Sequence, residues 1–244
     1  MLITMAFYSS AASSREALVG VATNFVEAGE DLKFRFELES QHTVKLVTGA
    51  TGALYAQIIN GAPLDLLLAA DQARPQQLVE QGFALGNSRF TYAMGTLTLW
   101  STNPKLGGRN ALDVLKAGTF RNLAIANPDL APYGAAAREV LALLDLNESL
   151  KGKIVQGQNV GQTFSMVATG NAELGLVALS HVLSQRNKFS GVRWDVPSEF
   201  YHPIRQDGVL LSRGIDNPAA RDFYVFLRSE QAKSIITRYG YGTE

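Results

Sequence analysis

The sequence predicts an α/β protein with two lobes, each a mostly parallel sheet flanked by helices. From Glu16 onward, six short apolar runs alternate with segments of helical spacing. The runs are apolar throughout instead of alternating with polar residues, which indicates strands buried on both faces and therefore parallel α/β units. Two longer strand candidates interrupt this alternation and predict two crossings between the lobes.

The short strand candidates and the helices between them follow one another along the chain. In order, the strand candidates are ALVGVA, TVKLVT, DLLLAA, NLAIA, KIVQG and LGLVAL. Leu54 and Ile58 are an example of the helical spacing that separates them. Helix boundaries agree, because Gly170 follows QTFSMVAT as a C-terminal stop, and Asn217 with Pro218 provides the N-cap and first turn of AARDFYVFLRS.

The two longer strand candidates mark the boundaries between the lobes. RFTYAMGTLTLWSTN (89–103) alternates like a crossing strand and is followed by the turn-rich PKLGGRN. The second candidate is YHPIRQDGVLLSR (201–213). We therefore expect one lobe to consist of residues 16–95 and 203–244, and the other of residues 96–202.

The composition is that of a globular protein without a polyanionic partner. The 244 residues are 46% hydrophobic and 18% charged, and 22 Lys and Arg balance 22 Asp and Glu, so nothing favours binding to nucleic acid. The absence of cysteine excludes disulfides, thiolate metal sites and cysteine nucleophiles. No apolar stretch reaches the roughly 18–20 residues that span a membrane, so we expect no direct membrane insertion.

Residues 1–15 differ in composition from the rest of the chain. The segment MLITMAFYSSAASS carries no charge, is apolar at its start and ends in small residues. These features predict the remnant of a secretory signal that lacks its basic segment, or otherwise a disordered leader.

Four strand ends run into predicted helices through uncharged residues. They lie in VATNF (21–25), VTGATGALYAQI (47–58), ANPDLAPYGAAAREVL (126–141) and QGQNVGQTFSMVATG (156–170). A helix N-terminus has unpaired N–H groups and a partial positive charge, so it binds anions without a cationic side chain. Open α/β sheets place ligands at the carboxyl ends of strands, and two of the turns fall in each lobe. We therefore expect the four turns to form a cradle for a small oxyanion in the cleft between the lobes.

Each turn supplies particular hydrogen-bond donors. The first offers the hydroxyl of Thr23 and the amide of Asn24, and the second offers the hydroxyl of Thr51 beside two glycines that allow close approach. Tyr133 begins the third helix, and Val160 can contribute only its backbone N–H at the start of the fourth. Each residue also has an ordinary structural explanation: Thr and Asn as N-caps, the glycines in a tight turn, and the tyrosine in packing.

Several segments together resemble one known family. VATNF, TGATGALYAQIINGAPLDLLLAADQ, SRFTYAMGTLTLWS, IANPDLAPYG, QNVGQTFSMVATGNAELGLVAL and FLRSEQAKSIITRYGY resemble the periplasmic molybdate-binding proteins of ABC importers, in the family's order and from about Ala17 to Tyr241. The resemblance implies the two-lobe periplasmic-binding-protein fold, with a ligand cleft between the lobes. It also implies a periplasmic receptor that captures molybdate or tungstate and delivers it to a membrane permease. We further expect a monomer that needs no cofactor.

The resemblance places the oxyanion contacts on hydrogen-bond donors, without a direct bond between the protein and the metal atom. The residues are Thr23, Asn24, Thr51, Tyr133 and, through its backbone, Val160. The sequence departs from the family pattern in two segments. The glycine-rich turn usually carries serine but here has Ala50 and Thr51, and Ala178 stands where some members have a tyrosine. Tyr133 is the candidate to replace that second contact.

The chemistry of the donors also limits the ligand. A fully ionised dianion such as molybdate or sulfate has only acceptors, so a site made of donors matches it. Phosphate keeps a proton and is better served by a site with a carboxylate acceptor. The nearest carboxylate in the four turns is Asp129, outside the proposed contacts, which argues against phosphate. The choice between molybdate and sulfate is one of cavity size, so a receptor of the same fold for sulfate or phosphate is the alternative.

An enzyme is the less favoured alternative. The sequence lacks GxSxG, HExxH, a GxGxxG after a strand, and a Walker lysine. His42, His181 and His202 are far apart in sequence, and we expect them to lie away from the four turns in surface or packing roles. Asp65 and Asp71 flank LLLAA and are expected to cap turns.

Overall fold

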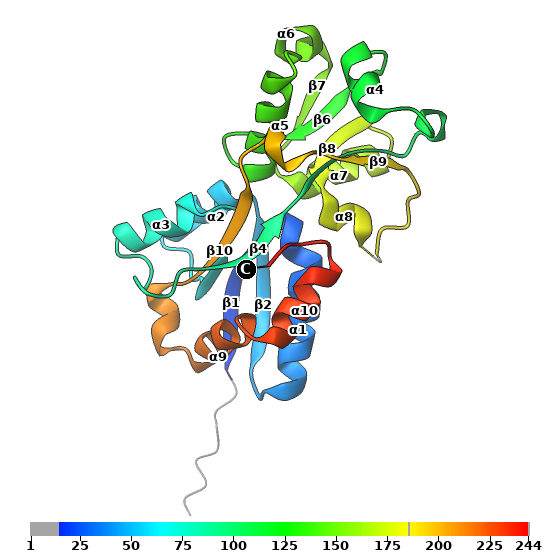
Figure 1. The fold of residues 1–244 in the computed structure, drawn as a ribbon. Coiled ribbons are helices and arrows are strands. Elements are labelled where there is room, and N and C mark those ends of the chain that lie inside the picture. Colours follow the sequence, from blue (N-terminus) through cyan, green and yellow to red (C-terminus); the bar gives the residue numbers. More distant parts are fainter. Residues whose placement is uncertain (1–14, 185, 244) are drawn as a thin grey trace, which may run out of the picture.

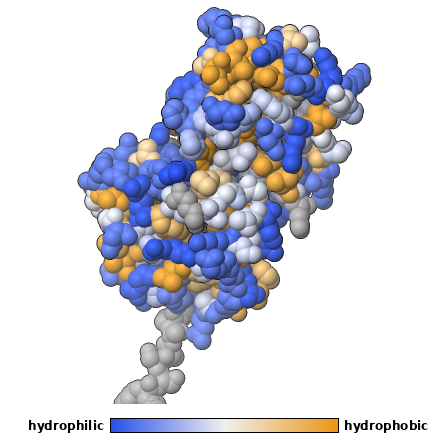
Figure 2. Space-filling model, viewed as in Figure 1, coloured by the Kyte–Doolittle hydropathy of each residue, from blue (hydrophilic) through white to orange (hydrophobic). Residues whose placement is uncertain are grey.

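The structure is a computed structural model that describes residues 15–184 and 186–243. Within these residues, two five-stranded sheets with flanking helices form two lobes that meet at a narrow waist (Figure 1). The predicted two-lobe α/β fold is confirmed. Figure 2 shows hydrophilic side chains spread over both lobes on the face that it presents. None of the helices in the described ranges has both the length and the apolar character that crossing a bilayer requires.

The prediction for residues 1–15, a signal remnant or a disordered leader, lies outside the described residues except for Arg15.

The first sheet has the strand order β2–β1–β3–β10–β4. Its strands are β1 (Glu16–Ala22), β2 (Thr43–Gly49), β3 (Leu66–Leu68), β4 (Phe90–Gly95) and β10 (Ile204–Leu210). Its helices are η1 (Thr23–Phe25), α1 (Val26–Glu39), α2 (Thr51–Ile59), α3 (Ala73–Glu80), η5 (Ser212–Asp216), α9 (Pro218–Leu227) and α10 (Glu230–Arg238). Leu66 and Leu68 pack in one cluster with residues of α1 and α9, whereas Leu67 packs on the other side with residues of α2 and α3. Strand β3 is continuously apolar because both of its faces are buried.

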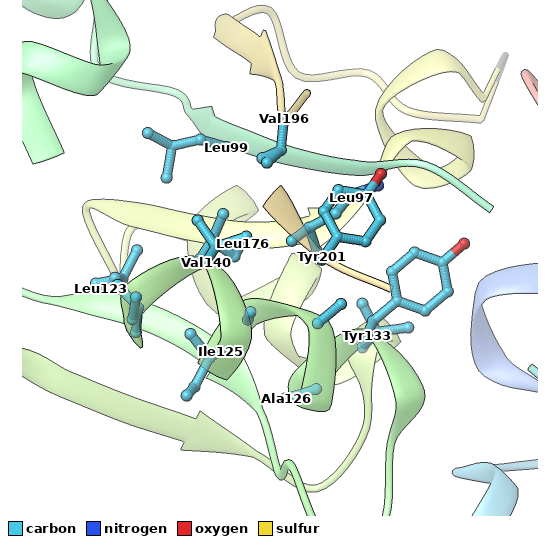
Figure 3. Close-up of a cluster of buried hydrophobic side chains, with 14 of the residues drawn as sticks. Leu97, Leu99, Leu123, Ile125, Ala126, Tyr133, Val140, Leu176, Val196 and Tyr201 are labelled. Carbon is cyan, nitrogen blue, oxygen red and sulfur yellow. The ribbon is translucent and has the colours of Figure 1, made fainter. Parts of the chain in front are cut away.

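The second sheet has the strand order β7–β6–β8–β5–β9. Its strands are β5 (Leu97–Ser101), β6 (Leu123–Ala126), β7 (Ile154–Gly157), β8 (Leu174–Ala178) and β9 (Val192–Asp195). Its helices are η2 (Pro104–Leu106), α4 (Ala111–Ala117), α5 (Pro132–Leu143), α6 (Asn147–Leu150), η3 (Lys151–Lys153), α7 (Val160–Ala168), α8 (Leu179–Leu183) and η4 (Ser198–Phe200). Leu123 and Ile125 pack against α5, as Figure 3 shows, whereas Ala124 packs with Val167 of α7 on the opposite face.

Both sheets follow the same plan, with parallel strands on one side and antiparallel pairing on the other. In the first sheet β10 is antiparallel to both of its neighbours, and in the second sheet β5 is. Each of these two strands begins where the chain arrives from the other lobe. The sheets are therefore mixed, although most of their strands point the same way.

All six short strand candidates are strands in the structure, and both long candidates lie at the waist. The segment 89–103 is divided at Thr96 into β4 and β5, so that one extended segment serves both sheets. The segment 201–213 contains β10. Strand β9 was not predicted. The exact lobe boundaries at 95/96 and 202/203 stay a prediction.

The end of the chain also reaches the waist (Figure 1). The N–H of Met94 in β4 donates to the carbonyl of Gly242 at 2.7 Å, and the N–H of Gly242 donates back at 3.0 Å. The preceding residue, Tyr241, is buried beside Phe25 and points its hydroxyl toward the first of the four turns.

Candidate functional site

The five residues proposed from the sequence line one cavity between the lobes. Its walls consist of Ala22, Thr23, Asn24, Gly49, Ala50, Thr51, Ala70, Ala131, Pro132, Tyr133 and Val160. These residues carry no charge at neutral pH. The cavity has a volume of about 10 Å³, room for about one water molecule. Its walls come from η1 and α2 in the first lobe and from α5 and α7 in the second, so an ion held here would contact both lobes.

Four helices begin at this cavity: η1, α2, α5 and α7. The N-cap positions of the first three are Ala22, Ala50 and Ala131, which have no side chain able to cap. By contrast, α9 is capped by Asn217, whose side chain accepts from the N–H of Ala219. The N-cap explanation for Thr23 and Thr51 is therefore wrong, because each lies one position inside its helix. At these three helix starts no side chain caps the N–H groups of the first turn.

Thr51 is buried at the start of α2 and holds a hydroxyl that can donate. Its Oγ accepts from the N–H of Ala70 at 2.9 Å, which leaves the hydroxyl hydrogen for a different partner. The next N–H, that of Gly52, donates across the cleft to the carbonyl of Leu130 at 2.9 Å. A Cβ on Gly52 would lie 3.2 Å from the backbone of Leu130, so glycine permits this close approach.

Thr23 links η1 to the other lobe. Its Oγ accepts from the N–H of Gly161 in α7 at 3.4 Å, so its hydroxyl hydrogen is likewise free to be donated. Val160, which precedes Gly161, packs its side chain in the core of the second lobe and is the first residue of α7. Asn159 caps α7 by accepting from the N–H of Gln162, and Val160 lines the cavity.

The side chain of Asn24 is used differently from what the sequence predicted. Its amide nitrogen donates to Oε1 of Gln206 at 2.8 Å and to the hydroxyl of Tyr241 at 3.0 Å. These two bonds use both amide hydrogens, so the side-chain NH₂ is not available to a ligand. The donor that remains is the backbone N–H in the first turn of η1.

Tyr133 lies with its ring in the core of the second lobe. Figure 3 shows its hydroxyl pointing away from the apolar cluster. The hydroxyl accepts from Nε2 of Gln206 at 3.3 Å. Burial raises the pKa of Tyr133 well above its ordinary value, so the hydroxyl stays protonated and can donate. Ala178, the other position that departs from the family pattern, is buried at the end of β8.

The prediction that the histidines lie away from the four turns is wrong for His181. Its Nε2 lies 3.0 Å from the carbonyl oxygen of Thr23, because α8 packs directly on η1. His42 is buried 3.3 Å from the carboxylate of Asp222, and His202 is exposed, as expected.

The two aspartates flanking β3 differ in role. Asp71 accepts from the N–H of Arg74 at 2.9 Å and caps the turn before α3, as predicted. Asp65 is not a turn cap, since its Oδ2 accepts from the N–H of Leu18 at 2.8 Å and from the amide of Asn217 at 3.1 Å. It joins β1 to the start of α9.

Sequence reasoning missed three residues at the site: Ser180, Gln206 and Tyr241. Each is buried and hydrogen-bonds to Asn24. No motif marks them, because they follow Asn24 by 156, 182 and 217 residues. In the part of the chain that the structure describes, no group of three or more His, Asp or Glu is placed to hold a metal ion.

Comparison with known proteins identifies the family. The profile of the bacterial extracellular solute-binding proteins matches residues 17–242. The chain belongs to this family. Among similar proteins, molybdate-binding protein ModA of Azotobacter vinelandii is 46% identical over 234 residues, which cover 96% of this chain and 92% of that protein. ModA of Rhodobacter capsulatus is 42% identical over 234 residues, covering 96% and 90%.

A solved structure gives the same relationship in three dimensions. The Azotobacter vinelandii periplasmic molybdate-binding protein matches this solute-binding protein with a TM-score of 0.89 at 39% identity, covering 93% of this chain and 99% of that one. Membership in the family confirms that the chain is a solute-binding protein with a role in transport and not an enzyme.

Proposed function

We propose that this solute-binding protein captures molybdate, and its analogue tungstate, in the cavity between the lobes and delivers it to the membrane permease of an ABC importer. The observation that carries the proposal is the convergence of four helix N-termini on one cavity without a charged residue in its walls. Similarity over nearly the full length of two ModA proteins supports this choice of ligand.

The donors suit a dianion for a physical reason. The hydroxyls of Thr23, Thr51 and Tyr133 and the N–H groups of Asn24 and Val160 all donate, and an ionised oxyanion only accepts. Charge-assisted hydrogen bonds and the positive ends of four helices offset the loss of hydration. No carboxylate lines the cavity to accept the proton of phosphate.

The proposal includes the setting in which the protein works. We place it in the periplasm as a monomer, with one oxyanion and one permease as its partners. Uptake and release of the ion then correspond to rotation about the waist, because the cavity walls belong to different lobes.

Thermal unfolding tests the ligand. The purified protein is heated alone and with molybdate, tungstate, sulfate or phosphate. A ligand at about 1,000 times its Kd adds about 4 kcal/mol to the free energy of unfolding, which raises the Tm by roughly 8–16 °C in a chain of this size. Such a shift with molybdate and tungstate but not with sulfate supports the proposal. A Tm shift with sulfate or phosphate alone would show that this anion, and not molybdate, is the ligand. No Tm shift with any of the four anions would refute the site.

A pair of variants then tests the backbone donor. Val160→Pro removes the N–H at the first position of α7, which proline tolerates, and the extended Asn159 (φ −151°, ψ 170°) suits the residue before a proline. Val160→Ala keeps the N–H and controls for the lost side chain. We expect Val160→Pro to bind molybdate at least tenfold more weakly than Val160→Ala, since charge-assisted bonds contribute about 1.5–3 kcal/mol. Equal Kd values for the two variants would exclude this N–H from the site.

A further inference from the structure

Two consecutive residues of the second lobe bond to two consecutive residues of the first. The hydroxyl of Ser180 in α8 donates to the carbonyl of Asn24 at 2.9 Å, and Nε2 of His181 lies 3.0 Å from the carbonyl of Thr23. Ser180 and His181 do not line the cavity whose walls include Thr23 and Asn24. They hold the turn by its carbonyl groups.

The contact with Thr23 defines the state of His181. A carbonyl oxygen only accepts, so Nε2 must carry the hydrogen. The other ring nitrogen, Nδ1, is buried without a partner, and the ring packs against Phe164 at 5.2 Å between centroids. An imidazolium would place a second N–H in these apolar surroundings, so the ring is neutral here. Burial lowers the pKa of His181, although the bond to Thr23 acts in the opposite direction.

Tyr241 shows that the carbonyl of Asn24 is a shared acceptor. The Tyr241 hydroxyl donates to it at 2.6 Å and lies 3.0 Å from Oγ of Ser180. Tyr241 follows α10 in the first lobe and holds Asn24 from within its own lobe. Among the described residues, Ser180 and His181 are the groups from the second lobe that bond to these two carbonyls.

We propose that Ser180 and His181 form a latch, a pair of positioning residues that orients the Thr23–Asn24 turn toward the anion and adds to affinity when the lobes close. This inference rests on the proposed function of the same cavity. Because the two bonds join residues of different lobes, a rotation that opens the cleft breaks them. The two hydrogen bonds therefore contribute to the free energy of ligand binding and not to the stability of the open form.

The latch is tested with variants at His181 that differ in one property. His181→Leu removes the donor and keeps an apolar side chain, whereas His181→Gln retains an N–H donor. We expect His181→Leu to bind molybdate about two- to tenfold more weakly than the wild type, the range for one net hydrogen bond, and His181→Gln to restore binding to within about twofold. Ser180→Ala should weaken binding by a similar factor. Calorimetry gives the Kd values, and the Tm without ligand should be unchanged.

His42→Leu is the matched control. His42 is equally buried, but it precedes β2, the strand whose opposite end, Gly49, lines the cavity. This variant should lower the Tm without ligand and leave the Kd unchanged.

The outcomes separate the latch from the ligand assignment. A wild-type protein that fails to bind molybdate overturns the proposed function. Wild-type binding with an unchanged Kd in His181→Leu and Ser180→Ala overturns the latch alone. The latch is also overturned if His181→Gln binds as weakly as His181→Leu, since the donor would then not be the cause.

Discussion

A methyl group at Gly95 should hinder closure of the lobes. Gly95 ends β4, at the point where the chain leaves the first lobe. A Cβ at this position would lie 2.1 Å from the hydroxyl of Tyr133 and 2.6 Å from Nε2 of Gln206. Neither distance is possible between unbonded atoms, so Gly95→Ala must displace one or both side chains.

The size of the effect follows from where the strain is released. Forcing an extra methyl group into a packed interior typically costs about 1–3 kcal/mol. Gln206 lies in β10 of the first lobe, so its side chain must shift in both forms. Tyr133 belongs to the second lobe, so we expect the clash with its hydroxyl to be relieved when the cleft opens and its cost to fall on the closed form. A difference of about 1–3 kcal/mol between the two forms weakens binding about 5- to 150-fold. We expect this increase in the Kd for molybdate in Gly95→Ala.

Calorimetric titration with molybdate, together with the Tm of the unliganded protein, distinguishes the possibilities. Gly152→Ala is the control, because a Cβ on Gly152 meets no atom within 4 Å. The control should leave the Kd and the Tm unchanged. If Gly95→Ala lowers the unliganded Tm but keeps the wild-type Kd, the strain is present in both forms and the reasoning is refuted.

Three further predictions concern single residues. Thr51→Ala should weaken molybdate binding at least tenfold. It should also lower the Tm of the unliganded protein by roughly 2–8 °C, because the N–H of Ala70 loses its acceptor. Thr51→Ser keeps the hydroxyl and should restore both the Kd and the Tm. Arg89→Met leaves the buried carboxylate of Asp207 without the guanidinium that lies 2.9 Å from it. Because Arg89 is partly exposed, we expect the free energy of unfolding to fall by about 1–3 kcal/mol, with no change in the Kd. Burial lowers the pKa of His181 in this structure, so protonation of the ring is expected to oppose closure. Affinity should be full above the ordinary histidine pKa of about 6.5 and fall as the pH drops below it in titrations, whereas His181→Gln should show no such fall.

The sequence allowed the fold to be predicted because its strands carry a strong signal. In β3, Leu66 and Leu68 are buried on one face and Leu67 on the other, so the whole strand is apolar and its burial on two sides can be inferred. Strand β9 gave no such signal, since its residues alternate between half-buried and exposed at the edge of the second sheet. The position of β9 in the sheet is set by its pairing with β5, and no local sequence pattern indicates that pairing.

The site could be predicted as far as its turns but not in its hydrogen bonding. Helix starts can be located from sequence only to within a residue or two. For that reason Thr23 and Thr51 were open to interpretation as N-caps, although alanines occupy those positions. The use of the Asn24 amide by Gln206, and of the Thr23 carbonyl by His181, depends on pairs 182 and 158 residues apart. Such pairs become visible only when the two lobes are placed together.

The same hydrogen bonds bear on how a site without charges distinguishes anions of equal charge. Molybdate and sulfate present the same acceptors, so discrimination must come from the size of the cavity, and a size filter needs walls that do not adapt. Flexible lysine or arginine side chains would follow either ion. Here the donors are backbone N–H groups and the hydroxyls of short or buried side chains at helix starts. Gln206 connects two of the turns by accepting from Asn24 and donating to Tyr133. Gln206 lies in β10, a strand at the waist, so widening the cavity for a larger ion and rotating the lobes involve the same bonds. Selectivity and closure are therefore expected to change together in variants of Gln206.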